Sequence, residues 1–293
     1  MKKYKPYLNR VDLVKNQVER EELREQEAKR KRSRSIQEQN RQNHLRYQEQ
    51  LRSEMAARYF HSVMSTGGES FSNTRSLLFD GTDDYVISSL DGTSGGGVLA
   101  SADSDVVTTI SLWFKIPSFP SSLKGIFQWA NALNDTSPFL LVQLQASGRI
   151  RFYVDGGYKF AQSVSLNTWY NIIITRTASN NTWTLYLNGS SIGTPYDDSG
   201  SQTARSSASS IYLGNGYNGY FNGFIDEVAI WNSDQSANIS TIYSDGTPSN
   251  IASLNPISWW RFEEGSGTTA TDSGTGGNNG TINGATYSTD VPS

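Results

Sequence analysis

The 293-residue chain contains no cysteine, so neither a disulfide nor a thiolate metal site contributes to its fold. It has only two histidines, His44 and His61, which leaves a zinc or iron site without its usual ligands. No run of 18 apolar residues is present, and the sequence predicts no transmembrane helix. The first residues, MKKYKPYLNRVDLVK, are basic without an apolar core, so we expect no secretory signal peptide.

Glycine and proline are absent from residues 11–60, a stretch dominated by Glu, Gln, Arg and Lys. These residues are good helix formers, and acid–base pairs recur at helical spacing, as in Glu21 with Arg24. We therefore expect a long N-terminal α-helix within residues 1–62, called the arm below. Gly67 and Gly68 interrupt this pattern, so residues 63–75 are expected to form a flexible linker.

The arm carries an apolar stripe in which residues repeat every four positions, namely Tyr47, Leu51, Met55 and Tyr59. We expect this stripe to mediate docking or oligomerisation, because a lone helix of this composition cannot bury it. No heptad pattern runs through the middle of the arm. Two arrangements stay open: a symmetric homo-oligomer such as a trimer, and docking onto a different protein.

Charge is divided unequally along the chain. Residues 1–65 hold 16 Lys and Arg against 9 Asp and Glu, a net charge of +7, whereas the remainder holds 9 against 19, a net charge of −10. The basic run KRKRSR at 29–34 is more typical of a charged helix face than of a nucleic-acid patch. A basic arm joined to an acidic body suggests an anchor and a head, and nucleic-acid binding is not expected.

From Ser76 onward the composition changes: short segments rich in Val, Ile, Tyr, Trp and Thr are separated by Gly, Asn, Asp and Ser. The segment TWTLYLNG alternates, with Trp183, Leu185 and Leu187 on one face. Asn-Gly and Asp-Gly pairs mark tight turns between such segments. About eleven segments predict an all-β sandwich of two antiparallel sheets, with one short helix near residues 236–243.

Four motifs carry a family resemblance: LLFDGTDDYV at 77–86, ISLWFKI at 110–116, LYLNG at 185–189 and GFIDEVAIW at 223–231. Together they resemble the laminin-G-like, concanavalin A-type lectin and glucanase family. The resemblance covers about residues 77–287. It implies a jelly-roll domain over residues 76–293, in a family whose members mostly bind sugars or proteins.

The end of the chain departs from the family pattern. The segment beginning WWRFEEGSG at residue 259 usually opens such a domain, and here it closes the chain. Residues 258–288 either complete a permuted jelly roll or form the start of a truncated repeat. We favour completion, because Trp259, Trp260 and Phe262 need burial and the rest of the chain offers no second domain.

The resemblance also implies a structural Ca²⁺ ion, which requires six to eight oxygen ligands. The matching carboxylates are Asp80 in the FDG turn and Asp226 in the FIDEV strand, and Asp83 and Asp84 are weaker candidates. The alternative is that Asp80 caps its turn and Asp226 makes hydrogen bonds.

Sugar binding requires exposed rings and amides in loops, because a pyranose face stacks on a ring and its hydroxyls need donors and acceptors. The loops NGYNGYFNG and VDGGYKF have this composition, and the candidate glycan-binding residues are Tyr158, Asn215, Tyr217, Asn218 and Tyr220. Turn formation is the alternative role for each of them.

Catalytic motifs are missing from the sequence. There is no run of the type E-x-D-x-x-E found in related glucanases and no G-x-S-x-G elbow. Glu263 and Glu264 are adjacent, so on a strand their side chains would point to opposite faces. We expect no catalytic residues and no enzymatic activity, with a glycoside hydrolase as the third reading.

The overall plan resembles that of a phage virion protein, such as a tail fibre, a head fibre or a capsid decoration. In this reading the arm docks onto other proteins of the particle, and the lectin-like head is exposed on the virion surface, where it binds a host-surface glycan. The alternative is a bacterial surface or extracellular module for carbohydrate binding or adhesion.

Overall fold

The computed structural model describes residues 71–89, 108–130, 132–133, 140–154, 157–177, 182–197 and 210–293, together with the isolated residues 21, 24, 31 and 42. The chain divides into two compact units, Met1–Ser70 and Phe71–Ser293. The expected long helix, its stripe of Tyr47, Leu51, Met55 and Tyr59, and most of the expected linker lie outside the described residues. The fold below is that of the second unit.

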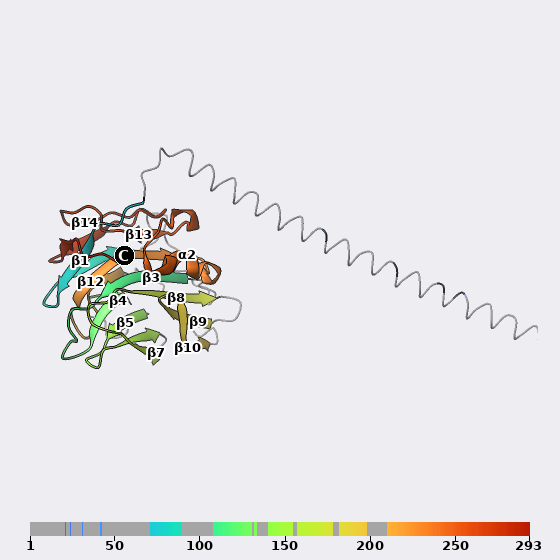
Figure 1. The fold of residues 1–293 in the computed structure, drawn as a ribbon, viewed down its shortest axis with the longest axis horizontal. Coiled ribbons are helices and arrows are strands. Elements are labelled where there is room, and N and C mark those ends of the chain that lie inside the picture. Colours follow the sequence, from blue (N-terminus) through green and yellow to red (C-terminus); the bar gives the residue numbers. More distant parts are fainter. Residues whose placement is uncertain are drawn as a thin grey trace, which may run out of the picture. The chain divides into compact units, whose positions relative to one another are not determined.

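The second unit is a sandwich of two antiparallel sheets, each with eight strands (Figure 1). Sheet A has the order β10 (Ser190–Asp197), β9 (Thr182–Leu187), β8 (Tyr170–Thr177), β3 (Thr108–Lys115), β12 (Asn222–Trp231), β1 (Ser76–Asp80) and β16 (Thr286–Ser288), with β13 (Ser258–Trp260) also paired to β12. Sheet B has the order β14 (Thr269–Ala270), β15 (Gly280–Asn283), β2 (Tyr85–Ser89), β11 (Ser210–Leu213), β4 (Lys124–Ala130), β5 (Leu140–Leu144), β6 (Arg149–Val154) and β7 (Gly157–Ser163). The expected jelly-roll sandwich is confirmed.

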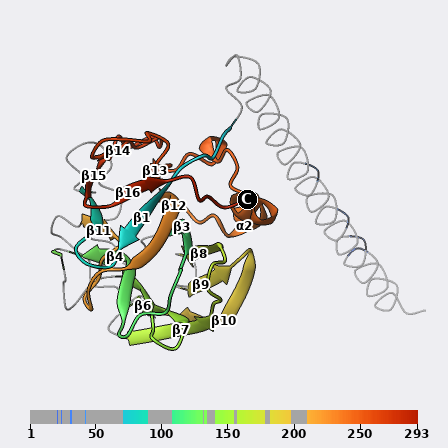
Figure 2. The ribbon, with the colours of Figure 1, turned by 60° about the vertical axis from the view of Figure 1, so that its left-hand side comes forward.

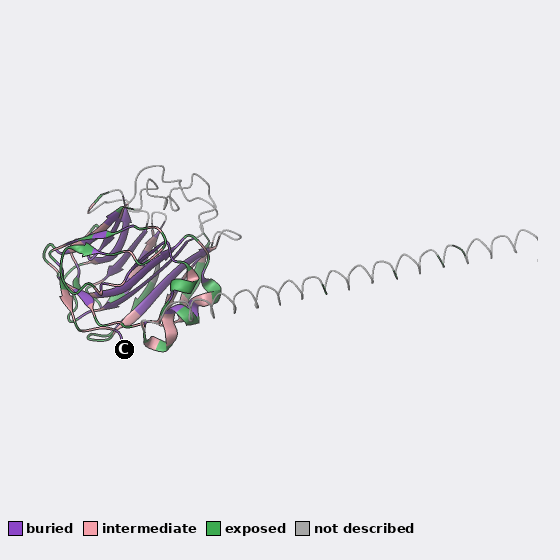
Figure 3. Ribbon diagram, turned by 90° about the horizontal axis from the view of Figure 1, so that it is seen from above, coloured by how far each residue is buried: buried purple, intermediate pink, exposed green. Residues whose placement is uncertain are grey.

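The main core lies between the two sheets and follows from the two-residue period of the strands. On β6 the buried residues Ile150, Phe152 and Val154 alternate with more exposed ones, and Trp183 of β9 packs against Phe152 with ring centroids 5.6 Å apart. Figure 3 shows the buried strands surrounded by exposed turns. Strand β3 is buried on both faces, because the outer face of sheet A is also covered.

A second, smaller core covers the outer face of sheet A. Here Ile173, Ala229 and Trp231 pack under helix α2 (Ile239–Tyr243) and three single-turn 3₁₀ helices. These are η1 (Ser236–Asn238), η2 (Ser244–Gly246) and η3 (Ala252–Leu254). The short helix expected near residues 236–243 is therefore present, with Ile239 and Ile242 as its buried face. None of the helices among the described residues has the length and apolar character needed to cross a membrane.

The C-terminal segment contributes strands to both sheets (Figure 2). β13 pairs with β12, β16 pairs with β1, and β15 pairs with β2. Trp260 and Phe262 enter the main core, whereas Trp259 enters the second core. Residues 258–288 are thus part of the same sandwich as residues 76–231.

The number of strands exceeds the eleven expected segments, because five short or polar strands lack a hydrophobic alternation. β10 contains Gly193 and Pro195 and lies at a sheet edge, and β14, β15 and β16 are two to four residues long and rich in Gly, Thr and Asn. The fifth is β7, which includes Tyr158, so the VDGGYKF segment expected to be a loop is partly a strand. These strands are fixed by their neighbours rather than by their own sequence pattern.

Candidate functional site

A pocket of about 250 Å³ lies at one end of the sandwich, where three connections meet. The turn after β1 contributes Asp80 and Gly81, the β3–β4 connection contributes Ser118 and Ser121, and β4 begins there with Lys124. The β11–β12 loop and the start of β12 complete the lining with Tyr220, Phe221 and Asn222, beside Pro120 and Leu144. We call this cavity the end pocket.

The end pocket combines two aromatic residues, Tyr220 and the fully buried Phe221, with many polar groups. Tyr220 is half-buried, and the remaining lining offers a carboxylate, an ammonium group, two hydroxyls and an amide. Asp80 lies beside Asn222, its partner in the β1–β12 register, and Gly81, at φ 84°, makes the tight turn that follows. Such a mixture can hydrogen-bond a polyhydroxylated ligand and stack against one of its apolar faces.

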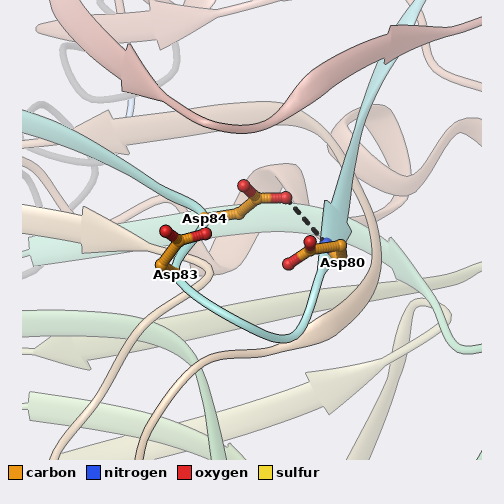
Figure 4. A group of neighbouring side chains, drawn as sticks. All are labelled: Asp80, Asp83 and Asp84. Atoms are coloured by element: carbon orange, nitrogen blue, oxygen red, sulfur yellow. Dashed lines mark hydrogen bonds between the residues drawn. The ribbon is translucent and has the colours of Figure 1, made fainter.

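Three carboxylates cluster in the turn that borders this pocket (Figure 4). Ligand oxygens of Asp80, Asp83 and Asp84 lie within 4.8 Å of one another, and Asp80 and Asp83 are exposed. Asp84 is buried and accepts the backbone N–H of Asp80 at 2.8 Å. Burial raises the pKa of the Asp84 carboxyl, and the neighbouring Asp80 and Asp83 charges raise it further.

These three residues fit a hard divalent cation in chemistry and in spacing, since Ca²⁺ prefers oxygen ligands 2.3–2.6 Å away. Asp84 is partly committed to protein contacts, because it accepts the N–H of Asp80 within the turn and packs against Gly284 between β15 and β16. Asp80 Oδ1 accepts the N–H of Thr82 at 2.7 Å, which is the turn-capping role that was the alternative to metal binding. Asp83 has the least committed carboxylate of the three.

Asp226, the other candidate calcium ligand, does not join this cluster. Asp80 pairs with Asn222 and Leu77 pairs with Ile225, so Asp226 lies four residues away along β12, about 13 Å from Asp80. It is also fully buried and accepts a hydrogen bond from Asn73 at 3.0 Å. A single ion bound by both residues is therefore not compatible with the register, and the hydrogen-bonding alternative describes Asp226.

A bulge in β12 places Asp226 and Glu227 together on the outer face of sheet A. Ile225 and Val228 both face the main core, so two residues lie between them instead of one, and Glu227 has a φ of 45°. Glu227 accepts hydrogen bonds from Trp259 and Arg261. Burial raises the pKa of Asp226 well above its usual range and that of Glu227 to about 7.

The β11–β12 loop holds four of the five candidate glycan-binding residues. Tyr217 is 47% exposed, and Asn218 and Tyr220 are half-exposed. Asn215 is buried and offers no surface to a ligand. The loop packs closely on β4, because the backbones of Gly216 and Gly125 are in contact and leave no space for a Cβ on either residue.

The fifth candidate, Tyr158, lies apart from this loop on β7, and its side chain is 44% exposed. The structure thus gathers Asp80 and Tyr220 at one pocket and leaves Tyr217 and Tyr158 outside its lining. Lys124, Ser118, Ser121 and Asn222 were not among the candidates. Their sequence context is an ordinary polar turn, and nothing short of the fold brings them together.

Comparison with solved structures places the fold in context. It is similar to that of a candidate carbohydrate-binding protein from Bacteroides ovatus, with 17% identity and a TM-score of 0.53 over 76% of this chain and 62% of that chain. The chain therefore spans less than two thirds of that protein. A heptameric SAP-like pentraxin from Limulus polyphemus matches at 14% identity and a TM-score of 0.44, over 58% of this chain and 82% of that chain.

A sialidase from Trypanosoma rangeli matches at 14% identity and a TM-score of 0.38, over 48% of this chain and 23% of that chain. No curated protein matches the sequence. Residues 80–238, more than half of the chain, match the model of a laminin-G family described as the concanavalin A-like lectin/glucanases superfamily. The chain belongs to this superfamily.

Proposed function

We propose that the sandwich is a carbohydrate-binding module and that the end pocket is its primary binding site. The observation that supports this most is that one cavity combines the half-exposed Tyr220 ring with the hydrogen-bonding groups of Lys124, Asn222 and Asp80. A sugar requires this combination, because its ring has an apolar face and its edges carry hydroxyls. The fold of the Bacteroides ovatus protein adds support by likeness of architecture alone.

The test is a glycan array probed with the full chain, followed by calorimetry on the strongest ligand. Tyr220→Ala and Lys124→Gln should each weaken binding about tenfold or more, since each removes a direct contact. Phe119→Ala is the matched control, because Phe119 is 42% exposed between two lining residues without lining the pocket itself. A chain that binds no glycan, or pocket variants that bind normally, would refute the proposal.

We propose binding rather than hydrolysis, because the acids at the end pocket all come from a single turn and Asp84 is committed to backbone contacts. Asp226 and Glu227 are buried on the outer face of sheet A instead. Release of reducing ends from a bound glycan during a long incubation would contradict this assignment.

We further propose that the arm anchors the head to a particle, as in a virion attachment protein. This proposal is supported by the charge distribution, because residues 1–65 are basic and the rest of the chain is acidic. Replacing Leu51 and Met55 by Asp should release the protein from its particle or oligomer, whereas Ser53→Asp, which lies off the stripe, should not. If the double variant stays on its particle or oligomer, anchoring is refuted. If the protein is found on a bacterial surface instead of a particle, the adhesion alternative is favoured.

A further inference from the structure

A second polar cluster lies on the outer face of sheet B, near the β7 edge of that sheet. Gln143 of β5 pairs with Arg151 of β6, and Tyr153 of β6 pairs with Tyr158 of β7. Since Phe152 faces the main core, its neighbours Arg151 and Tyr153 face outward. None of these residues lines the end pocket.

The side chains of this cluster contact one another closely. The Arg151 guanidinium lies 3.5 Å from the centre of the Tyr158 ring, and the rings of Tyr153 and Tyr158 meet edge to face at 5.2 Å. Arg151 Nη2 donates a long hydrogen bond of 3.4 Å to Gln143 Oε1. The guanidinium is thus held in position by a ring and an amide, and Arg151 as a whole is partly exposed.

The cluster has donors without acceptors. Among the residues that the structure describes, Arg151 Nε and Gln143 Nε2 find no hydrogen-bond partner, and both atoms are buried. Arg149, two residues along the same strand face, is exposed and directs one nitrogen to the carbonyl of Ala161. Within the described part of the chain, neither arginine has a carboxylate within 4.0 Å.

This arrangement is unusual for an acidic body, because the chain beyond residue 65 carries a net charge of −10. Carboxylates that could pair with an arginine are therefore abundant, yet none does so here. An arginine presents a planar array of N–H groups that matches the two oxygens of a carboxylate. The exposed part of the Tyr158 ring offers an apolar surface beside that position.

We propose that Arg151 and Tyr158 form a second subsite that binds the carboxylate of an acidic sugar, such as a uronic or sialic acid unit, with the buried Gln143 holding the guanidinium in position. That the ligand is a saccharide rests on the function proposed above; that it is anionic rests on a positioned arginine that has no carboxylate partner among the described residues. The carboxylate meets the terminal nitrogens of the partly exposed Arg151, and the sugar ring lies against Tyr158. Arg149 adds attraction without a fixed contact.

The experiment is a glycan array of uronic-acid, sialylated, sulfated and neutral glycans, probed with the full chain and with two variants. Arg151→Gln should reduce signal on carboxylate-bearing glycans at least tenfold and leave neutral glycans unchanged. Lys124→Gln, in the end pocket, should act on the neutral glycans instead. Arg151→Lys, which keeps the charge but loses the planar fork, should behave like Arg151→Gln if a fixed carboxylate contact is made.

Calorimetry on the best acidic ligand and on its carboxyl methyl ester provides the decisive comparison, with thermal melting to confirm that each variant is folded. The wild type should bind the ester at least tenfold more weakly than the free acid, whereas Arg151→Gln should bind the ester and the acid equally. Binding only to neutral glycans, or only to sulfated ones, would overturn the carboxylate subsite and leave the proposed function in place. Absence of binding to any glycan would overturn both.

Discussion

Trp259 donates its indole N–H to the carboxylate of Glu227 over 2.5 Å, in the buried space outside sheet A. Glu227 sits on the β12 bulge and Trp259 on β13, which belongs to the C-terminal segment. The same carboxylate accepts a hydrogen bond from Arg261, whose guanidinium lies 4.4 Å from the Phe71 ring. One buried acid therefore holds the two ends of the sandwich domain to the middle of a sheet.

Trp259→Phe should destabilise the domain by about 1–3 kcal/mol, because it leaves a buried carboxylate oxygen without its donor. Chemical denaturation measures the change. Trp169→Phe is the matched control: Trp169 donates its indole N–H to Asp290 at 3.0 Å, but that carboxylate is 40% exposed and water can replace the bond. Equal losses of stability in the two variants would show that the buried contact with Glu227 adds no more stability than the exposed contact with Asp290.

Stability should fall as pH rises from about 4.5 to about 7. Burial raises the pKa of Glu227 from 4.5 to about 7, with the Arg261 charge and the hydrogen bonds from Trp259 and Arg261 acting in the opposite direction. Between these values the folded state binds more protons than the unfolded state, so the free energy of unfolding decreases with pH. The adjacent Asp226, whose pKa is also raised, acts with the same sign.

A pKa rise of this size corresponds to an upper bound of roughly 3 kcal/mol. Melting curves at pH 5 and pH 8 measure it. Glu227→Gln should reduce the difference between the two pH values, whereas Glu264→Gln, an exposed acid that accepts the N–H of Thr271, should preserve it. A wild type that is more stable at pH 8 than at pH 5 would contradict the expected sign.

The sequence was informative where local rules decide the structure. Alternation in TWTLYLNG correctly indicated a strand with Trp183 and Leu185 in the core, and Asn188 and Gly189 form the turn that follows it. The same rule fails at Asp226 and Glu227. Alternation alone would place adjacent residues on opposite faces, but the bulge, which depends on the pairing with β3, puts both on one face.

The candidate site was harder to predict than the fold, because it depends on contacts between distant segments. Asn215 has the composition of a sugar-binding loop, yet it is buried because Gly216 packs on Gly125, ninety-one positions earlier in the chain. Lys124 and Ser118 reach the end pocket for the same non-local reason. Tyr220 could be singled out from its loop alone, whereas its neighbours in space could not.

Gly125→Ala should disturb the end pocket through the loop. An added Cβ at Gly125 would lie 2.4 Å from the Cα of Gly216, so the β11–β12 loop must move. We expect a loss of about 1–3 kcal/mol in stability together with weaker glycan binding. Gly267→Ala separates the two effects: its φ of +91° makes the change unfavourable, but the new methyl meets nothing within 4 Å. Normal glycan binding by the folded Gly125→Ala variant would show that the loop position is not required.

Calcium should stabilise the domain through the turn of Asp80, Asp83 and Asp84. Three carboxylates whose oxygens lie within 4.8 Å repel one another, and an ion that binds only the folded state adds stability by mass action. At a hundredfold excess over Kd the gain is about 2.7 kcal/mol. The measurement is thermal melting of chelator-treated protein with and without added Ca²⁺.

Asp83→Asn is the informative variant for this test, because Asp83 is exposed, whereas Asp84 supports the turn by accepting the N–H of Asp80. The variant should lose most of the response to Ca²⁺ and keep the fold. Asp234→Asn is the matched control, since Asp234 is exposed and accepts the N–H of Ser236 at 2.8 Å, far along the chain from the cluster. Mg²⁺ should stabilise less, because it demands a smaller octahedral shell that one turn supplies poorly. If Ca²⁺ leaves the melting temperature of the wild type unchanged, or if Asp83→Asn responds as strongly as Asp234→Asn, the three carboxylates serve the turn alone.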